Sequence, residues 1–190
     1  MSGDSPATEG LFQVYPPQQN REDFDLDVVF VHGLGEDSVS TWTENTTYWP
    51  RDLLPTSKLY ENARMLTFGY NTEGFLSANG GYHNVRTFTC AEALVTDLAD
   101  NRKADPYRPL IFVGHSLGGI IIKSAIKYAF VQPDIYGSIV ESTKAIVFFS
   151  TPHQGADAGA WNAIFASFQQ ADIHDTLVVQ ELTLWSSMLL

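Results

Sequence analysis

The sequence predicts an α/β fold, in which a mostly parallel sheet is covered by helices on both of its faces. Short apolar runs alternate along the chain with longer segments whose apolar residues recur at helical spacing. We therefore expect strands at 27–31, 63–68, 110–114 and 144–150. The run at 27–31 is continuously apolar, as is typical of a strand buried on both faces of a parallel sheet.

Local signals predict the shorter elements. Residues 11–15 favour a short edge strand that ends at Pro16 and Pro17. Residues 49–54 favour a short helix that stops at Pro55. Because 69–84 is rich in glycine, we expect a loop there.

Two longer helices are also expected. The first covers 85–103 and has one apolar and one polar side. Its apolar positions are Phe88, Ala91, Leu94, Val95 and Leu98, and its polar positions are Asp97, Asp100 and Arg102. The second begins after a glycine-rich turn at 114–118 and ends near Val131, with Lys123 and Lys127 marking its solvent side.

Composition limits the classes of function. The chain has 190 residues, of which 44% are hydrophobic and 17% charged, a balance typical of a globular domain. We expect a flexible segment at 1–10 and a single domain at 11–190. The net charge of −11 argues against binding to nucleic acid or to anionic lipid.

The compartment is predicted from what the sequence does not contain. Cys90 is the only cysteine, so an intrachain disulfide is excluded. No signal peptide and no apolar run of ~20 residues is present, so we expect a cytoplasmic protein without a membrane span.

The segment with the most chemical information is Gly114-His115-Ser116-Leu117-Gly118. A strand is expected before it and a helix after it, which is the context that a G-x-S-x-G nucleophile elbow requires. Small residues beside the serine allow a sharp turn that exposes its hydroxyl. The motif predicts acyl transfer through Ser116.

A second motif, Val31-His32-Gly33-Leu34-Gly35, follows the first buried strand. An acyl-transfer serine needs backbone N–H groups aimed at the developing oxyanion. We expect one donor to be the amide of Leu117 and the other to be the amide of Leu34. His32 is predicted to brace this loop rather than to act as a base.

A third motif, 150–157, follows the last expected strand and therefore lies at the edge of the sheet where ligands bind. It contains His153, for which two interpretations stay open. In the first, His153 has a functional role and contacts substrate or orients the serine loop. In the second, its ring only forms hydrogen bonds with the local backbone.

Together these motifs resemble the α/β-hydrolase superfamily, in particular its intracellular serine esterase and lipase branch. The resemblance covers 11–157 and includes the lines 28–35, 41–43, 49–55, 63–71, 113–119 and 145–157. It is closest to the GPI inositol-deacylase-like and serine-active-site lipase-like proteins, and to hydrolase modules at the N-terminus of fungal multidomain proteins. The resemblance implies a Ser-acid-His esterase that needs no metal or other cofactor.

In this fold the acid and the histidine follow the serine along the chain, on loops after later strands. Asp157 with His174 has the correct order, and Asp134, Glu141, Asp172 and Asp175 are further acids. However, 161–190 has a helical pattern and an apolar end, so we expect an incomplete domain that lacks its last strands. The acid and the histidine of the triad are then expected beyond residue 190.

Two functions from different classes follow. The first is a serine hydrolase of carboxylic or lipid-like esters, nearly inactive as this fragment alone. An apolar substrate of this kind would suit the aromatic residues Trp42, Trp49 and Phe75 near the expected crevice, whereas Phe149 is expected in the core.

The second function is a non-catalytic, hydrolase-like sensor or interaction module that works with other domains of a longer polypeptide. Acyl transfer to an acceptor other than water is a third option.

Overall fold

The computed structural model describes residues 9–17, 23–72 and 83–153. Five strands form one sheet in the order β1-β5-β2-β6-β7. Their bounds are β1 Gly10–Tyr15, β2 Leu26–Val31, β5 Ala63–Gly69, β6 Leu110–His115 and β7 Thr143–Phe149. Only β1 is antiparallel to its neighbour, and the other pairs are parallel. The predicted mostly parallel α/β sheet is confirmed.

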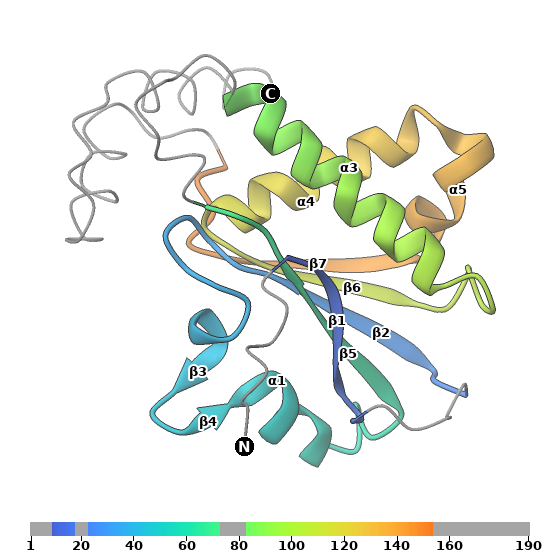
Figure 1. Cartoon of the computed structure of the whole chain (residues 1–190). Helices are drawn as coiled ribbons and strands as arrows, with labels where there is room; N and C mark the ends of the chain where they lie inside the picture. The colour runs from blue at the N-terminus through green and yellow to red at the C-terminus, as the bar shows by residue number, and fades with distance from the viewer. Residues whose placement is uncertain (1–8, 18–22, 73–82, 154–190) are drawn as a thin grey trace, which may run out of the picture.

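Helices cover both faces of this sheet (Figure 1). One face carries α3 His83–Asn101, α4 Leu117–Phe130 and α5 Pro133–Ser142. The other face carries the short helix α1 Trp49–Asp52, the 3-10 turns η1 Ser40–Trp42 and η2 Leu54–Thr56, and a small hairpin of β3 Thr43–Glu44 with β4 Thr47–Tyr48. No helix in the described part of the chain is long and apolar enough to cross a membrane.

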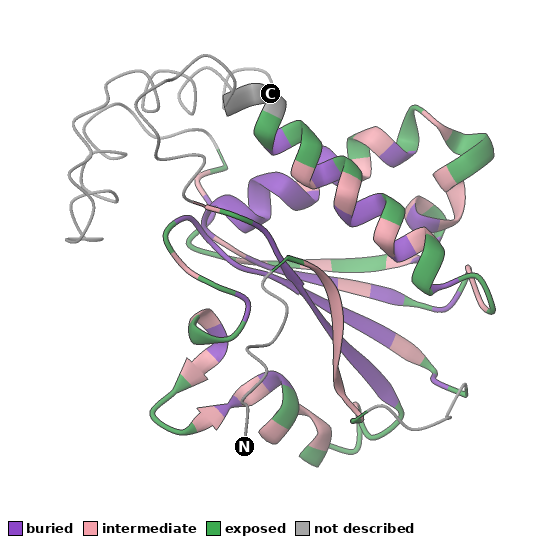
Figure 2. Cartoon of the chain, in the orientation of Figure 1, coloured by how far each residue is buried: buried purple, intermediate pink, exposed green. Residues whose placement is uncertain are grey.

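The core lies on both sides of the central strands (Figure 2). Alternate residues of β2 point to opposite faces, so Val29 and Val31 pack on the side of α3 and α4. Val28 and Phe30 pack with Trp42 on the other side. This two-sided burial explains why β2 has no polar alternation.

Several local predictions were wrong. Helix α5 was not expected, and the turn after α1 continues through Pro55 as η2. Phe88, expected on the buried side of α3, is 46% exposed, although Ala91, Leu94, Val95 and Leu98 are fully buried. Arg102, expected to face solvent, is 1% exposed.

Arg102 is buried because it pairs with Asp27 at the start of β2. Asp27 is fully buried and also binds Arg64, with Nε 2.8 Å from Oδ1, and Arg108, with Nη1 3.3 Å from Oδ1. Three guanidinium groups therefore share one carboxylate. The cluster lies at the amino ends of the strands, opposite the edge that carries Ser116, so its role is in stability.

Candidate active site

Ser116 lies at the junction between β6 and α4, where the backbone turns sharply. Its φ of 48° and ψ of −118° lie in a region that non-glycine residues rarely adopt. Such a conformation costs on the order of 1–3 kcal/mol and persists only where its surroundings hold it. Two bonds hold it here: Ser116 N donates to Phe149 O at 2.9 Å, and Gly119 N donates to Ser116 O at 3.2 Å.

Close packing at this turn requires glycine. A Cβ on Gly118 would overlap the carbonyl oxygens of Val31 and His32, at the end of β2. A Cβ on Gly114 would lie 2.8 Å from the backbone of Gly119. The first turn of α4 therefore lies directly against the ends of β2 and β6, which brings the loop after β2 to the serine.

The loop after β2 is braced by His32 and Tyr70. Tyr70 N donates to His32 Nε2 at 3.2 Å, so His32 Nδ1 carries the ring proton and donates to Gly33 O at 2.9 Å. The Tyr70 hydroxyl also donates to His32 O at 2.8 Å, and the two rings stack at 4.2 Å. Burial lowers the pKa of His32, and nearby hydrogen bonds and carboxylates offset this only in part. With both ring nitrogens engaged, His32 has no free lone pair for a base.

The backbone amides of Leu34 and Leu117 meet a basic requirement for oxyanion donors. Neither has a hydrogen-bond acceptor among the described residues. Both side chains are buried in the core, which fixes the backbone that carries the amides. Leu117 is also the first residue of α4, where helix N–H groups have no acceptor within the helix.

Glu36 is a residue of this site that the sequence did not indicate. Its Oε2 accepts hydrogen bonds from His115 Nδ1 at 2.7 Å, from Gly33 N at 3.1 Å and from Thr41 Oγ1 at 3.0 Å. Burial raises the pKa of Glu36, but the hydrogen bond and the charge of His115, with the other two bonds, outweigh it and lower this pKa overall. No pattern in the sequence links Glu36 to His115, which lies 79 positions away.

A pocket of about 460 Å³ opens beside the serine turn. It is lined by Thr41, Trp42, Trp49, His115, Phe149 and Ser150. Trp42 and Trp49 pack edge to face at 5.5 Å, and both pack on Phe30 beneath them. Phe149 was expected in the core but is 46% exposed, because β7 is the outer strand of the described sheet and Phe149 faces this pocket.

The other predicted residues of the site form no hydrogen bond with Ser116 in the part of the chain that the structure describes. His153 is exposed and its ring packs edge to face on Phe148 at 4.5 Å. No described residue forms a hydrogen bond with Ser116 Oγ. Asp157 and His174 lie outside the described residues, as does Phe75. Among the described residues, no three His, Cys, Asp or Glu side chains are grouped to hold a metal ion.

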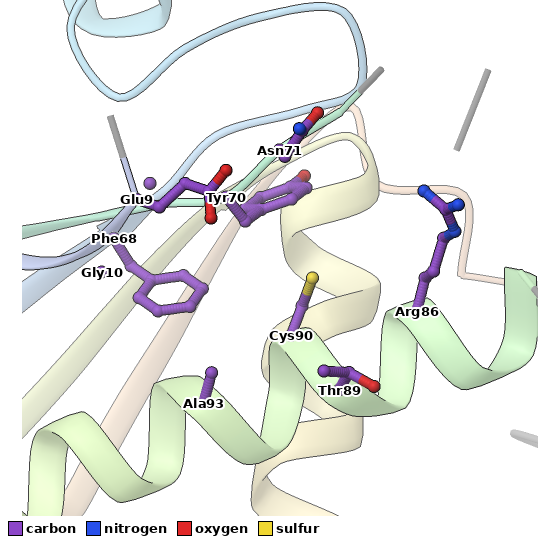
Figure 3. Close-up of a pocket in the computed structure, with 10 residues that line it drawn as sticks. Glu9, Gly10, Phe68, Tyr70, Asn71, Arg86, Thr89, Cys90 and Ala93 are labelled. Atoms are coloured by element: carbon purple, nitrogen blue, oxygen red, sulfur yellow. The ribbon is translucent and has the colours of Figure 1, made fainter. Parts of the chain in front are cut away.

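A second pocket, of about 260 Å³, lies between the ends of β1 and β5 and helix α3 (Figure 3). Cys90 projects into it from α3, toward Tyr70, which directly follows β5. Burial and the charge of Glu9 raise the pKa of the Cys90 thiol to about 12, against a smaller lowering effect of Arg86.

Cys90 is therefore expected to resist alkylation. The thiolate is the reactive form, and a shift from 9.0 to about 12 reduces its fraction at neutral pH on the order of 10³-fold. Iodoacetamide should modify the folded protein slowly at neutral pH and faster as the pH approaches 12. Because the chain has one cysteine, mass spectrometry reads this site directly. Equal rates for folded and urea-unfolded protein at neutral pH would contradict the expectation.

Comparison with known proteins agrees with this architecture. SERAC1 of Danio rerio is 28% identical over 167 residues, which cover 77% of this chain and 25% of that protein. SERAC1 of Homo sapiens is 24% identical over 166 residues, covering 78% and 25%. The chain thus spans about a quarter of the length of these curated relatives.

Among solved structures, the mature lipase BlEst2 of Bacillus licheniformis matches with a TM-score of 0.57 and 16% identity, over 94% of this chain and 62% of the lipase. This likeness confirms the α/β-hydrolase fold that the sequence predicts. The model of a serine esterase family matches residues 23–179, which is most of the chain. The chain therefore belongs to the family described as "Putative serine esterase (DUF676)".

Proposed function

We propose that this chain carries the nucleophile and the oxyanion hole of a serine esterase. Ser116 Oγ attacks the carbonyl carbon of a carboxylic ester, and its proton passes to a base outside the described residues. The alcohol leaves with a proton, and water then releases the acid from the acyl-enzyme. The amides of Leu34 and Leu117 stabilise the oxyanion in both steps.

The observation that carries the proposal is the position of Ser116 in a strained turn at the carboxyl end of a central strand. The positive φ of Ser116, between β6 and α4, matches the geometry of a nucleophile elbow. The register pairs Val31 with Gly114, so β2 ends, and the loop after it begins, at the same edge of the sheet as Ser116. Family membership gives independent support.

The pocket beside the turn supports an apolar acyl group as the substrate class. Its walls include Trp42, Trp49 and Phe149, and its volume is within the range of about 300–1,000 Å³ that small-molecule sites occupy. An acyl chain placed there would contact these aromatic rings, next to His115, which directly precedes Ser116. We propose carboxylic or lipid-like esters, without naming one.

The test is hydrolysis of nitrophenyl esters of increasing acyl length by the longest natural form of the protein that contains this chain. Ser116→Ala should lower kcat by about 10⁶-fold, as loss of a triad serine does. The matched control is Ser124→Ala, because Ser124 is buried in α4, the helix that begins directly after Ser116, and its hydroxyl has no partner among the described residues. A folded Ser116→Ala variant that hydrolyses these esters at the parent rate would overturn the proposal.

The alternative, a hydrolase-like module that senses or binds without catalysis, predicts a different result. Ser116→Ala would then leave the biological effect of the full protein intact. Analysis of products with and without an alcohol acceptor separates hydrolysis from acyl transfer.

A further inference from the structure

One oxygen of Glu36 connects three segments that surround the serine turn. It accepts a hydrogen bond from the loop after β2 through Gly33 N, and a second from the residue before Ser116 through His115 Nδ1. The third comes from Thr41, in the wall of the 460 Å³ pocket. The side chains of Glu36 and His115 are 21% and 27% exposed, so the bridge is half-buried.

The geometry leaves little space between these segments. A Cβ on Gly33 would lie 3.0 Å from His115 Nδ1 and 3.1 Å from Ser116 Cβ. The Gly33 backbone therefore lies against the serine turn, and the distance between them is set by what holds the loop in place. On the far side of the loop His32 and Tyr70 fix it to β5. On the near side the carboxylate of Glu36 joins it to His115.

We infer that Glu36 is a positioning residue, which sets the spacing between the Gly33–Leu34 loop and the Ser116 turn. This inference rests on the proposed esterase function. Because Glu36 accepts the Gly33 N–H, that amide is occupied, whereas the Leu34 N–H has no acceptor among the described residues and can serve as an oxyanion donor. The ion pair with His115 places a cationic partner beside the carboxylate when the imidazole is protonated, which reduces its repulsion of a nearby oxyanion.

The experiment compares Glu36→Gln with a matched control, Glu44→Gln, which neutralises an exposed glutamate on β3. A fluorophosphonate is used to titrate the longest natural form of the protein. The concentration dependence separates the affinity for the probe from the maximal rate of phosphonylation. Glu36→Gln should leave the affinity unchanged and lower the maximal rate by up to about 10²-fold, the size expected for a misplaced catalytic group. Glu44→Gln should change neither.

A second readout does not depend on reactivity. Hydrogen exchange of the amides in 33–36 and 115–118 should be faster in Glu36→Gln than in the parent and in Glu44→Gln. In the double variant Glu36→Gln/His115→Asn, the two losses of rate should not multiply, because both changes break the same bridge.

The outcomes are distinguishable. If the parent reacts and Glu36→Gln reacts at the same maximal rate, the positioning role is overturned while the esterase proposal stands. If the folded parent does not react, the esterase proposal fails, and exchange alone decides whether Glu36 holds the two segments. Unchanged exchange in both segments would overturn that bridge as well.

Discussion

Replacement of Asp27 by asparagine is expected to lower the free energy of unfolding by about 3–5 kcal/mol, the cost of removing one partner from a buried ion pair. Asp27 is the shared counter-charge of Arg64, Arg102 and Arg108, whose side chains are 9%, 1% and 6% exposed. Asparagine preserves the shape of the side chain but leaves three buried cations without this carboxylate. The carboxylate of Asp105 pairs with Arg108 at 3.4 Å and is half exposed, so it does not replace Asp27.

Urea unfolding followed by circular dichroism measures this change. The control is Asp100→Asn, because Asp100 is 66% exposed and pairs with Lys103 at the surface of α3. An exposed pair of this kind contributes about 0–1 kcal/mol. Equal stabilities of the Asp27 and Asp100 variants would show that the buried cluster does not hold the amino ends of the strands together.

The second large effect is expected for Gly118→Ala. The added methyl overlaps the carbonyl oxygens of Val31 and His32, which are backbone atoms that cannot rotate away. Overpacking of this kind costs about 1–3 kcal/mol, and more where the backbone must move. Because Gly118 follows Leu117 in the first turn of α4, the same movement shifts the Leu117 amide relative to Ser116.

Gly137→Ala is the matched control for this substitution. Gly137 lies inside α5, where the nearest atoms to an added Cβ are 3.8 Å and 4.0 Å away. Alanine in an open helical position is favoured over glycine by about 0.5–1 kcal/mol. Thermal unfolding should therefore show a lower Tm for Gly118→Ala and a higher Tm for Gly137→Ala. A Gly118→Ala protein as stable as the parent would contradict the close packing of α4 on β2.

The sequence predicts those features that depend on local patterns. The strands β2, β5, β6 and β7 were expected from apolar runs, and β1 from a short run that ends at two prolines. Helix α5 was not predicted, although Pro133 at its first turn is a favourable start for a helix.

Partners far apart in the chain account for most of the errors. Helical periodicity placed Arg102 on the polar side of the helix expected at 85–103, and only the tertiary structure brings it to Asp27, 75 positions earlier. Phe149 belongs to the apolar run of β7, which favours a core position, but its burial depends on what covers this outer strand. A periodic pattern gives the direction of a side chain and not the neighbour that it meets.

The same distinction applies to the site. The turn at Ser116 and the loop at His32 are short motifs, and both were expected at the positions where the structure places them. No short motif predicts the roles of Glu36 and Tyr70, because their partners His115 and His32 lie 79 and 38 positions away in the sequence. Asp157 and His174 remain predictions of the sequence.

The most direct test of the central claim is the mass of a fluorophosphonate adduct on the longest natural form of the protein that contains this chain. If Ser116 is an activated nucleophile, the adduct should be found on the peptide that contains Ser116. It should be absent from Ser116→Ala and present in Ser124→Ala. A folded protein that forms no adduct, or an adduct at another residue that persists in Ser116→Ala, would contradict the assignment of Ser116 as the nucleophile.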